Sequence, residues 1–258
     1  MLMQGHDDSG LAGSAGLYRE APPISPLAGH FLCAWSHRVA PDHCGPMAIV
    51  PDGCVDIVWL AGRLHVAGPD IVAAMPEPPA GASILGLRFA PGAAAHWLGV
   101  PMPELVGRQV ALADLWGVRV QELTARMGEA RTAGERLIQM QAGLAKLASG
   151  MAPQAPDMAF VFDRLSRGPV SIEALADRLD VSVRTLRRRS LEAFGYGPKT
   201  LERILRFQRF LRLARDGGEA GLATLGLAAG YADQAHLGRE VMSLSGSTPA
   251  RLVGQLGG

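Results

Sequence analysis

The chain has 258 residues, of which 48% are hydrophobic and 19% charged, a composition typical of globular proteins and long enough for two domains. Its apolar runs are too short to cross a bilayer, and its three cysteines (Cys33, Cys44, Cys54) do not suit a secreted disulfide framework. The net charge of +1 is unevenly distributed along the chain. Residues 1–159 hold 10 basic and 14 acidic side chains, whereas residues 160–258 hold 15 basic and 10 acidic side chains. The basic C-terminal part favours an anionic partner.

The N-terminal half is predicted to be rich in strands. Residues 1–16 have neither the basic start nor the apolar core of a signal peptide, so we expect a flexible leader and a cytoplasmic protein. Between residues 30 and 100, short apolar runs alternate with Pro and Gly. We expect turns at 51–53 and 61–63, the second closing a hairpin. The predicted strands are residues 31–39, 48–50, 55–60, 64–67 and 83–89.

From residue 103 to 148 the pattern becomes helical. One apolar stripe consists of Leu137, Met140, Leu144 and Leu147. A sheet edge or this stripe is a candidate dimer surface, and the sequence leaves monomer and homodimer open. Gly and Pro residues at 149–157 then mark a boundary between domains 17–150 and 157–258. We therefore predict an α+β chain: a small, barrel-like β-rich domain with a helical tail, followed by an all-α domain.

The C-terminal region repeats a pattern at an offset of 51 residues. Ser182, Leu186, Arg188, Gly195 and Pro198 correspond to Asp233, Leu237, Arg239, Gly246 and Pro249. In each copy we expect an N-cap, a buried Leu, an outward Arg two positions later, and a Gly beyond the helix C-terminus.

Each of these helices follows another helix after a short turn. This order predicts two helix-turn-helix units, each with a second helix able to enter a major groove. A linker helix from Pro198 to the Gly217-Gly218 pair joins them, with Leu201, Ile204, Leu205 and Leu211 buried. We expect its arginines at 203, 206, 209 and 212 to be largely solvated.

Residues 230–241, from Gly230-Tyr231 through Leu237-Gly238-Arg239, and the closing Gly246-Ser247-Thr248-Pro249 resemble the signature of AraC-type regulators. The resemblance covers residues 158–258. Three positions depart from the family pattern: Asp180 stands where a turn Gly is common, Ser190 where a Phe is usual, and Gly226 in place of a small Ala.

The resemblance implies a set of DNA contacts. Arg184, Arg187 and Arg188 would face base edges in the first unit, and Gln234, Ala235, Gly238 and Arg239 in the second. Arg pairs with guanine and Gln with adenine. Lys199, Arg203 and Arg251 better suit phosphates. A solvated helix face is the simpler interpretation of the arginine run, but its place inside a repeated unit favours groove contact.

The N-terminal half resembles a poorly characterised sensory domain found ahead of some AraC-type modules, through residues 51–59 and 86–92. It suits a small-molecule effector held by apolar walls and a few polar groups. Our candidate lining is Trp35, Asp52, Asp56, Trp59 and Arg88, although a structural Arg–Asp pair is equally compatible.

Two alternatives use the N-terminal domain differently. Cys33, His37, His43, Cys44 and Cys54 would serve a metal- or thiol-responsive regulator, but they lack the paired spacing of most zinc sites. A β-barrel enzyme would need a motif such as His-x-His or His-Glu-x-x-His, which is missing from the sequence.

We therefore predict a cytoplasmic, sequence-specific transcription regulator that is not an enzyme and needs no cofactor. Double-stranded DNA and a small-molecule effector are its expected partners, RNA polymerase is a further candidate, and no membrane is involved.

Overall fold

The computed structural model describes residues 15–151, 153–217 and 220–256. The predicted leader lies outside them except for its last two residues, and Gly16 already starts a strand. Within this part of the chain, no helix has the length and apolar character needed to cross a membrane.

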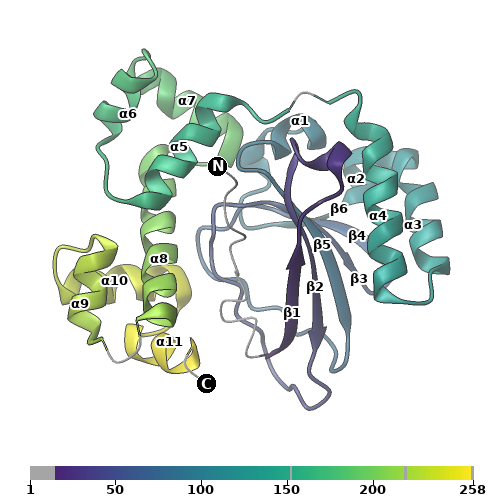
Figure 1. Ribbon diagram of the computed structural model, residues 1–258, viewed down its shortest axis with the longest axis horizontal. Coiled ribbons are helices and arrows are strands. Elements are labelled where there is room, and N and C mark those ends of the chain that lie inside the picture. The colour runs from purple at the N-terminus through teal and green to yellow at the C-terminus, as the bar shows by residue number, and fades with distance from the viewer. Residues whose placement is uncertain (1–14, 152, 218–219, 257–258) are drawn as a thin grey trace.

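The N-terminal domain is built on an antiparallel sheet of six strands in the order β1-β2-β5-β3-β4-β6 (Figure 1). Strands β1 and β6 form its edges. The strands are β1 (Gly16–Ala21), β2 (Phe31–Val39), β3 (Asp56–Leu60), β4 (Arg63–Ala67), β5 (Ser83–Phe89) and β6 (Gln109–Ala111).

The sheet confirms four of the predicted strands and corrects three expectations. Residues 48–50 form no strand, because Ile49 makes only an isolated bridge to Ala74. Strand β1 had been assigned partly to the leader, and β6 lies within the segment expected to be helical. Both are edge strands paired on one side only, so their short local patterns carry little of the signal that a central strand has.

Helices cover one face of the sheet (Figure 1). Ile57, Leu85 and Leu87 of the sheet are buried in one core with Met140 and Leu144 of the longest of these helices. The covering elements are η2 (Ser25–Leu27), α1 (Ala94–Leu98), η3 (Met102–Glu104), α2 (Leu112–Trp116), η4 (Gly117–Val120), α3 (Gln121–Glu129) and α4 (Ala133–Ala148).

Helix α4 begins at a capping box, in which the Thr132 side chain accepts from the Glu135 amide and Glu135 accepts from the Thr132 amide. Leu137 and Leu147 pack against the same core as Met140 and Leu144. The apolar stripe of α4 is therefore used within the chain, which removes it as a candidate dimer surface.

The opposite face of the sheet carries polar and aromatic side chains. Because side chains alternate along a strand, the register places Glu20 beside Trp35, and Arg88 beside both Cys33 and Asp56. We call this surface, with Tyr18, Glu20, Trp35, Asp56 and Arg88, the polar face.

The C-terminal region is helical and has a separate core centred on Phe207 and Phe210. Its helices are α5 (Pro156–Arg167), α6 (Ile172–Arg178), α7 (Val183–Phe194), α8 (Pro198–Asp216), α9 (Leu222–Ala229), α10 (Gln234–Ser245) and α11 (Pro249–Leu256). The expected end of α8 is confirmed at Gly217, whereas Gly218 lies outside the described residues.

The two domains meet along a seam. Ala48, Val50, Cys54 and Val106 of the N-terminal domain pack against the C-terminal core. Hydrogen bonds between described residues also cross the seam: Gln208 Nε2 donates to the Pro51 carbonyl at 2.7 Å, and the Ala73 amide donates to the Leu244 carbonyl at 2.7 Å. The N-terminal domain is therefore joined to α8 through a side chain and to α10 through the backbone.

The β3–β4 hairpin generates a stability prediction. Its two turn residues, Ala61 and Gly62, both have positive φ, at 50° and 79°. This conformation is strained for Ala and easier for Asn. We expect Ala61→Asn to raise the free energy of unfolding by about 1 kcal/mol, and Ala61→Val to lower it because a branched Cβ suits this region worst. Urea unfolding of both variants is the measurement, and an equal effect of the two would contradict the turn assignment.

Candidate nucleic-acid interface and sensory site

The first helix-turn-helix unit consists of α6 and α7. The Ser171 side chain accepts from the Ala174 amide at 3.0 Å and so begins α6, and Ser182 does the same for α7 by accepting from the Thr185 amide at 3.1 Å. Between the helices, Asp180 has a φ of 52°, which explains why a Gly is common here in the AraC family. Gly195, with φ 82°, ends α7.

The second unit, α9 and α10, repeats this construction. Asp233 caps α10 by accepting from the His236 amide at 2.6 Å, and Gly246 ends it with a φ of 69°. The predicted cap and end glycine are therefore confirmed in both copies. The left-handed residue here is Gly230, three positions before the cap, whereas Asp180 lies two positions before its cap. Both turns have four residues, 179–182 and 230–233, so they differ in where the left-handed residue lies and not in length.

The remaining departures from the family pattern have local explanations. Ser190 is fully buried and its hydroxyl donates to the Tyr196 carbonyl at 2.8 Å, so this position ties α7 to its own C-terminal turn. At Gly226 an added Cβ would lie 3.1 Å from Leu237 Cδ2. The missing methyl group lets α9 and α10 approach closely.

Helix α8 supports both units, and one of its arginines corrects the expectation of solvated side chains. Arg209 is buried, with an exposed fraction of 7%. Its guanidinium donates to the carbonyls of Leu165 and Ala229 at 2.6 Å and of Ser166 at 3.3 Å. Burial lowers the pKa of Arg209, with the charges of Arg212 and Arg206 adding to the effect. Arg209 therefore joins the C-terminal ends of α5 and α9 to α8.

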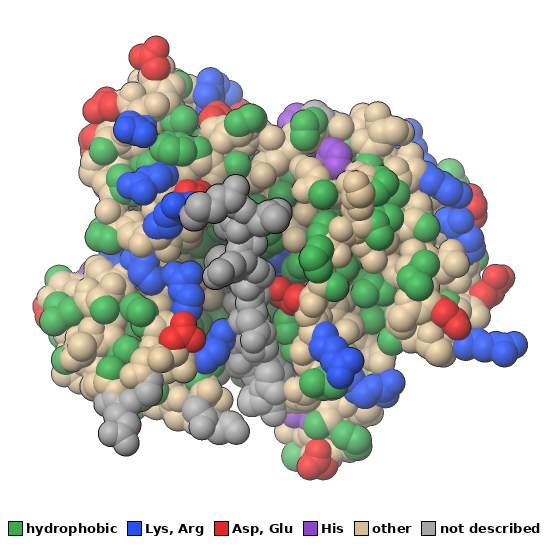
Figure 2. All heavy atoms as spheres, viewed as in Figure 1, with side chains coloured by type: hydrophobic (Ala, Val, Ile, Leu, Met, Phe, Trp, Pro, Cys, Tyr) green, Lys and Arg blue, Asp and Glu red, His purple; other side chains and the backbone are tan. Residues whose placement is uncertain are grey.

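The residues expected to face DNA lie mostly at the surface. Arg184, Arg187 and Arg188 are exposed on α7, as are Gln234, Ala235 and Arg239 on α10, and Gly238 is partly buried. Lys199 and Arg251 are also exposed. Lys and Arg side chains gather along the C-terminal domain in Figure 2. Arg188 pairs with Glu192 at 2.8 Å, but both side chains are largely exposed, so the pair is weak and open to exchange.

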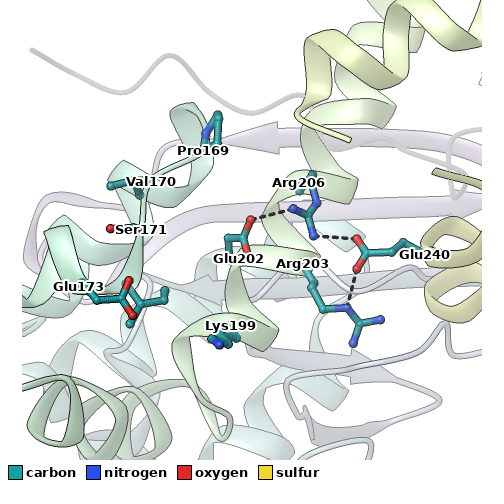
Figure 3. Close-up of a pocket in the computed structure, with 10 residues that line it drawn as sticks. Pro169, Val170, Ser171, Glu173, Lys199, Glu202, Arg203, Arg206 and Glu240 are labelled. Carbon is teal, nitrogen blue, oxygen red and sulfur yellow. Dashed lines mark hydrogen bonds and ion pairs between the residues drawn. The ribbon is translucent and has the colours of Figure 1, made fainter. Parts of the chain in front are cut away.

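Arg203 differs from the other expected phosphate contacts. Its Nε donates to Glu240 Oε1 at 2.9 Å, and the neighbouring Arg206 donates to Glu240 Oε2 at 2.9 Å and to Glu202 at 2.9 Å (Figure 3). These residues line a surface hollow of about 640 Å³ between α6, α8 and α10. The sequence analysis did not predict that Arg206 and Glu240 form an ion pair. The signals that pointed to it were the row of arginines on α8 and the Glu that follows Arg239.

On the polar face, four of the five residues proposed for an effector site come together. Arg88 lies 3.1 Å from Asp52, 3.3 Å from Asp56 and 3.8 Å from Glu20. The Trp35 indole donates to Asp56 at 3.4 Å. The indole packs closely against Gly86, since a Cβ there would be 2.3 Å from its ring.

Tyr18 and Glu20 join this group and were missed because β1 was not predicted. Tyr18 stacks on Trp35 with centroids 5.9 Å apart and donates to Glu20 at 2.6 Å. Burial raises the pKa of the Tyr18 hydroxyl. Trp59, the fifth proposed residue, is not brought to this group. It is 5% exposed and packs in the core on the opposite, helix-covered face.

The cysteines do not gather. Cys33 is buried in β2, Cys44 is exposed, and Cys54 lies at the domain seam. Burial raises the pKa of the Cys33 thiol, which keeps it protonated and unreactive at neutral pH. Within the described residues, no three His, Cys, Asp or Glu side chains are grouped so that they could hold a metal ion.

These features define the class of the protein: two capped helix-turn-helix units on a common frame, with exposed arginines on their second helices, form a DNA-binding domain. Residues 175–255 match the family described as a helix-turn-helix domain, and residues 19–111 match a domain of unknown function, DUF6597. The C-terminal region is an AraC-type helix-turn-helix domain, the kind of domain that DNA-binding regulators carry.

Among solved structures, the chain is similar to ToxT from Vibrio cholerae. One ToxT structure is 9% identical, with a TM-score of 0.48 over 87% of this chain and 98% of that chain. Another, of wild-type ToxT bound to an unsaturated fatty acid, is 11% identical, with a TM-score of 0.43 over 87% of this chain and 95% of that chain. No protein with a curated description matches the chain.

Asp70 generates a pH prediction at the seam. It follows Pro69, whose carbonyl accepts from the Gly107 amide at 3.0 Å. Burial raises the pKa of the Asp70 carboxyl to about 7, and the charges of Asp52 and Asp56 add to this. A folded-state pKa above the unfolded value means that the folded chain holds the proton more tightly. Stability is therefore lost as the pH rises from about 4 to about 7.

We expect Asp70→Asn, which mimics the protonated carboxyl, to be more stable than the parent, by a margin that grows from pH 4 to 7 and is constant above. The measurement is urea unfolding of both proteins at several pH values. Asp42→Asn, at an exposed turn, controls for the loss of one negative charge. A margin that does not change with pH would show that folding leaves the pKa of Asp70 unshifted.

Proposed function

We propose that this chain is a cytoplasmic, sequence-specific transcription regulator whose affinity for DNA is controlled by a small organic effector bound at the polar face of the N-terminal sheet. One observation carries the proposal that the chain recognises a DNA sequence. Arg188 and Arg239 occupy the same position in the two repeats, and both are exposed on the capped second helix of a unit that packs on α8. Two units on one frame suit successive major-groove segments of an asymmetric site.

In this proposal, Arg184, Arg187 and Arg188 read base edges in one segment, and Gln234, Ala235, Gly238 and Arg239 in the next. Lys199, Arg203 and Arg251 bind phosphates. The first unit carries more of the reading, because Ala235 and Gly238 offer α10 few side-chain donors.

We expect Arg188→Ala and Arg239→Ala each to lose about 1–3 kcal/mol of discrimination between the selected DNA site and random duplex. Lys199→Ala, the phosphate control, should weaken binding to both DNAs alike and reduce the salt dependence. Affinities measured at several salt concentrations test this. Equal losses on both DNAs for Arg188→Ala would show that Arg188 does not read bases.

The effector part is supported by the composition of the polar face. An aromatic pair, Tyr18 and Trp35, lies beside a guanidinium and several carboxylates, all of them partly buried. Such a mixture suits an organic ligand that is held by burial and oriented by a few directed hydrogen bonds. Trp59 is left out of the proposed site because of its place in the opposite core.

The seam supplies a physical route from the effector to DNA. Asp52 contacts Arg88 of the polar face, and the adjoining Pro51 accepts from Gln208 of α8. An effector that favours one arrangement of this loop would favour one setting of the α8 frame, by as much as its affinity differs between the two.

The metal- or thiol-responsive alternative needs Cys33, Cys44 and Cys54 to act together, and their separation and the raised pKa of Cys33 favour the organic effector instead. An enzyme is the less favoured alternative, because residues 175–255 are accounted for by a DNA-binding domain.

We expect a library of small organic molecules to contain compounds that raise the melting temperature of the chain, and the same compounds to act on the Cys33/Cys44/Cys54→Ser triple variant. Trp35→Leu should abolish these shifts, because the indole forms the floor of the proposed site. Trp59→Leu, a matched loss of an indole from the opposite face, should lower stability but keep the shifts. Divalent metals that stabilise the parent but not the triple variant would instead establish the metal-responsive alternative.

A further inference from the structure

The repeat makes two side chains equivalent that have opposite charges. At the offset of 51 residues, Arg189 of α7 corresponds to Glu240 of α10, and each directly follows the outward arginine, Arg188 or Arg239. Each also forms an ion pair with a helix outside its own helix-turn-helix unit. The ion pair that joins the second helix to a neighbouring helix, called the tie below, thus lies at the same position in both units. The side chain on the second helix is the cation in the first unit and the anion in the second.

Glu240 holds α10 to α8 with both of its oxygens. Oε1 accepts from Arg203 and Oε2 from Arg206, each at 2.9 Å (Figure 3). The exposed fractions of the Glu240 and Arg206 side chains are 13% and 14%, so this pair is better shielded from water than a surface pair, whereas the Arg203 side chain is 39% exposed. Arg206 is itself held by Glu202 and lies over the Tyr231 ring, 5.2 Å from its centroid.

Arg189 plays the corresponding part in the first unit. Its Nη1 lies 2.8 Å from Asp157 Oδ2, and the other carboxylate oxygen of Asp157 accepts from the Met158 amide at 2.8 Å. Asp157 is in the first turn of α5. The α7 helix is therefore joined to α5 as α10 is joined to α8.

A tie at this position controls the rotation of the helix about its own axis. Successive side chains on a helix point about 100° apart, so residues 189 and 240 lie on the flank while 188 and 239 point outward. A rotation of about 20° would move an Arg tip by roughly 3 Å, which is enough to break a bidentate contact with a base.

We propose that Arg189 and Glu240 are positioning residues for sequence readout: they touch no base, but they set the rotation of α7 and α10, each for its own half of the DNA site. This inference rests on the proposed function, since it presupposes that α7 and α10 read bases. It extends that function to residues whose side chains point away from the proposed groove contacts.

Glu240→Gln should move two measurements in opposite directions. The amide can accept from one guanidinium but presents its NH₂ group to the other, so α10 loses its bidentate tie. Discrimination in the half-site read by α10 should then fall about 5- to 10-fold. Affinity for random duplex should rise about 2-fold at low salt, because a negative charge is lost beside Arg203 and Lys199. A variant that is merely destabilised would lose both.

The experiment selects sequences from a pool of randomised double-stranded DNA with the full chain, its Glu240→Gln and Arg189→Gln variants, and sequences the bound fraction. Glu240→Gln should flatten the base preferences of one half of the selected site, and Arg189→Gln those of the other half. Circular dichroism and thermal melting check that each variant is folded.

Glu202→Gln is the matched control. It removes the same charge from the same hollow, but its partner Arg206 lies on its own helix, so the tie between α8 and α10 remains. This variant should raise the affinity for random duplex and keep the preferences of both halves. Arg203→Gln, which removes one of the two bonds to Glu240, should flatten the same half as Glu240→Gln and serves in its place should that variant fail to fold.

Unchanged preferences in Glu240→Gln, or equal flattening of both halves by Glu240→Gln, would overturn the positioning role. A parent chain that selects no sequence at all would instead overturn the proposed function itself. The variants inform on positioning only when the parent chain selects a DNA sequence. The two failures are thus distinguished by the parent protein alone.

Discussion

Arg209 joins the ends of two helices to a third from inside the C-terminal domain, and the geometry of the DNA-binding surface depends on this contact. Its guanidinium donates to carbonyls at the C-termini of α5 and α9, where the helix dipole concentrates negative charge. A buried cation is costly unless such acceptors surround it. Helix α8 therefore becomes a frame that supports both helix-turn-helix units, and the settings of α7 and α10 are defined relative to it.

The two faces of the N-terminal sheet differ in the side chains they carry. One face is buried under α1–α4 with Ile57, Leu85 and Leu87, and it accounts for the domain core. The other brings Tyr18, Trp35, Asp56 and Arg88 to one place beside the loop that meets α8. Because side chains alternate along each strand, one sheet buries a core on one face and gathers charged and aromatic side chains on the other, and Asp52 and Pro51 link that second face to α8 through Arg88 and Gln208.

Much of the C-terminal domain could be predicted from the sequence because its signals are local. A cap such as Ser182 or Asp233 accepts a hydrogen bond from an amide three residues away. A glycine such as Gly246 ends a helix because its own backbone adopts a positive φ, which requires no distant partner. The sheet was harder: β1 and β6 are edge strands that depend on partners distant in sequence, and the run at 48–50 has strand-like composition but almost no partner.

The sequence by itself determined the repeat, the caps and turns of both units, the outward positions of Arg188 and Arg239, and the basic charge of the C-terminal region. Only the tertiary structure decided the partners of the remaining charged residues. It buried Arg209, joined Arg203 and Arg206 to Glu240, and brought Arg88 to Asp52 while sending Trp59 to the opposite face. The physical reason is range: caps and turns are satisfied within a few residues, whereas an ion pair or a buried indole depends on which distant elements pack against it.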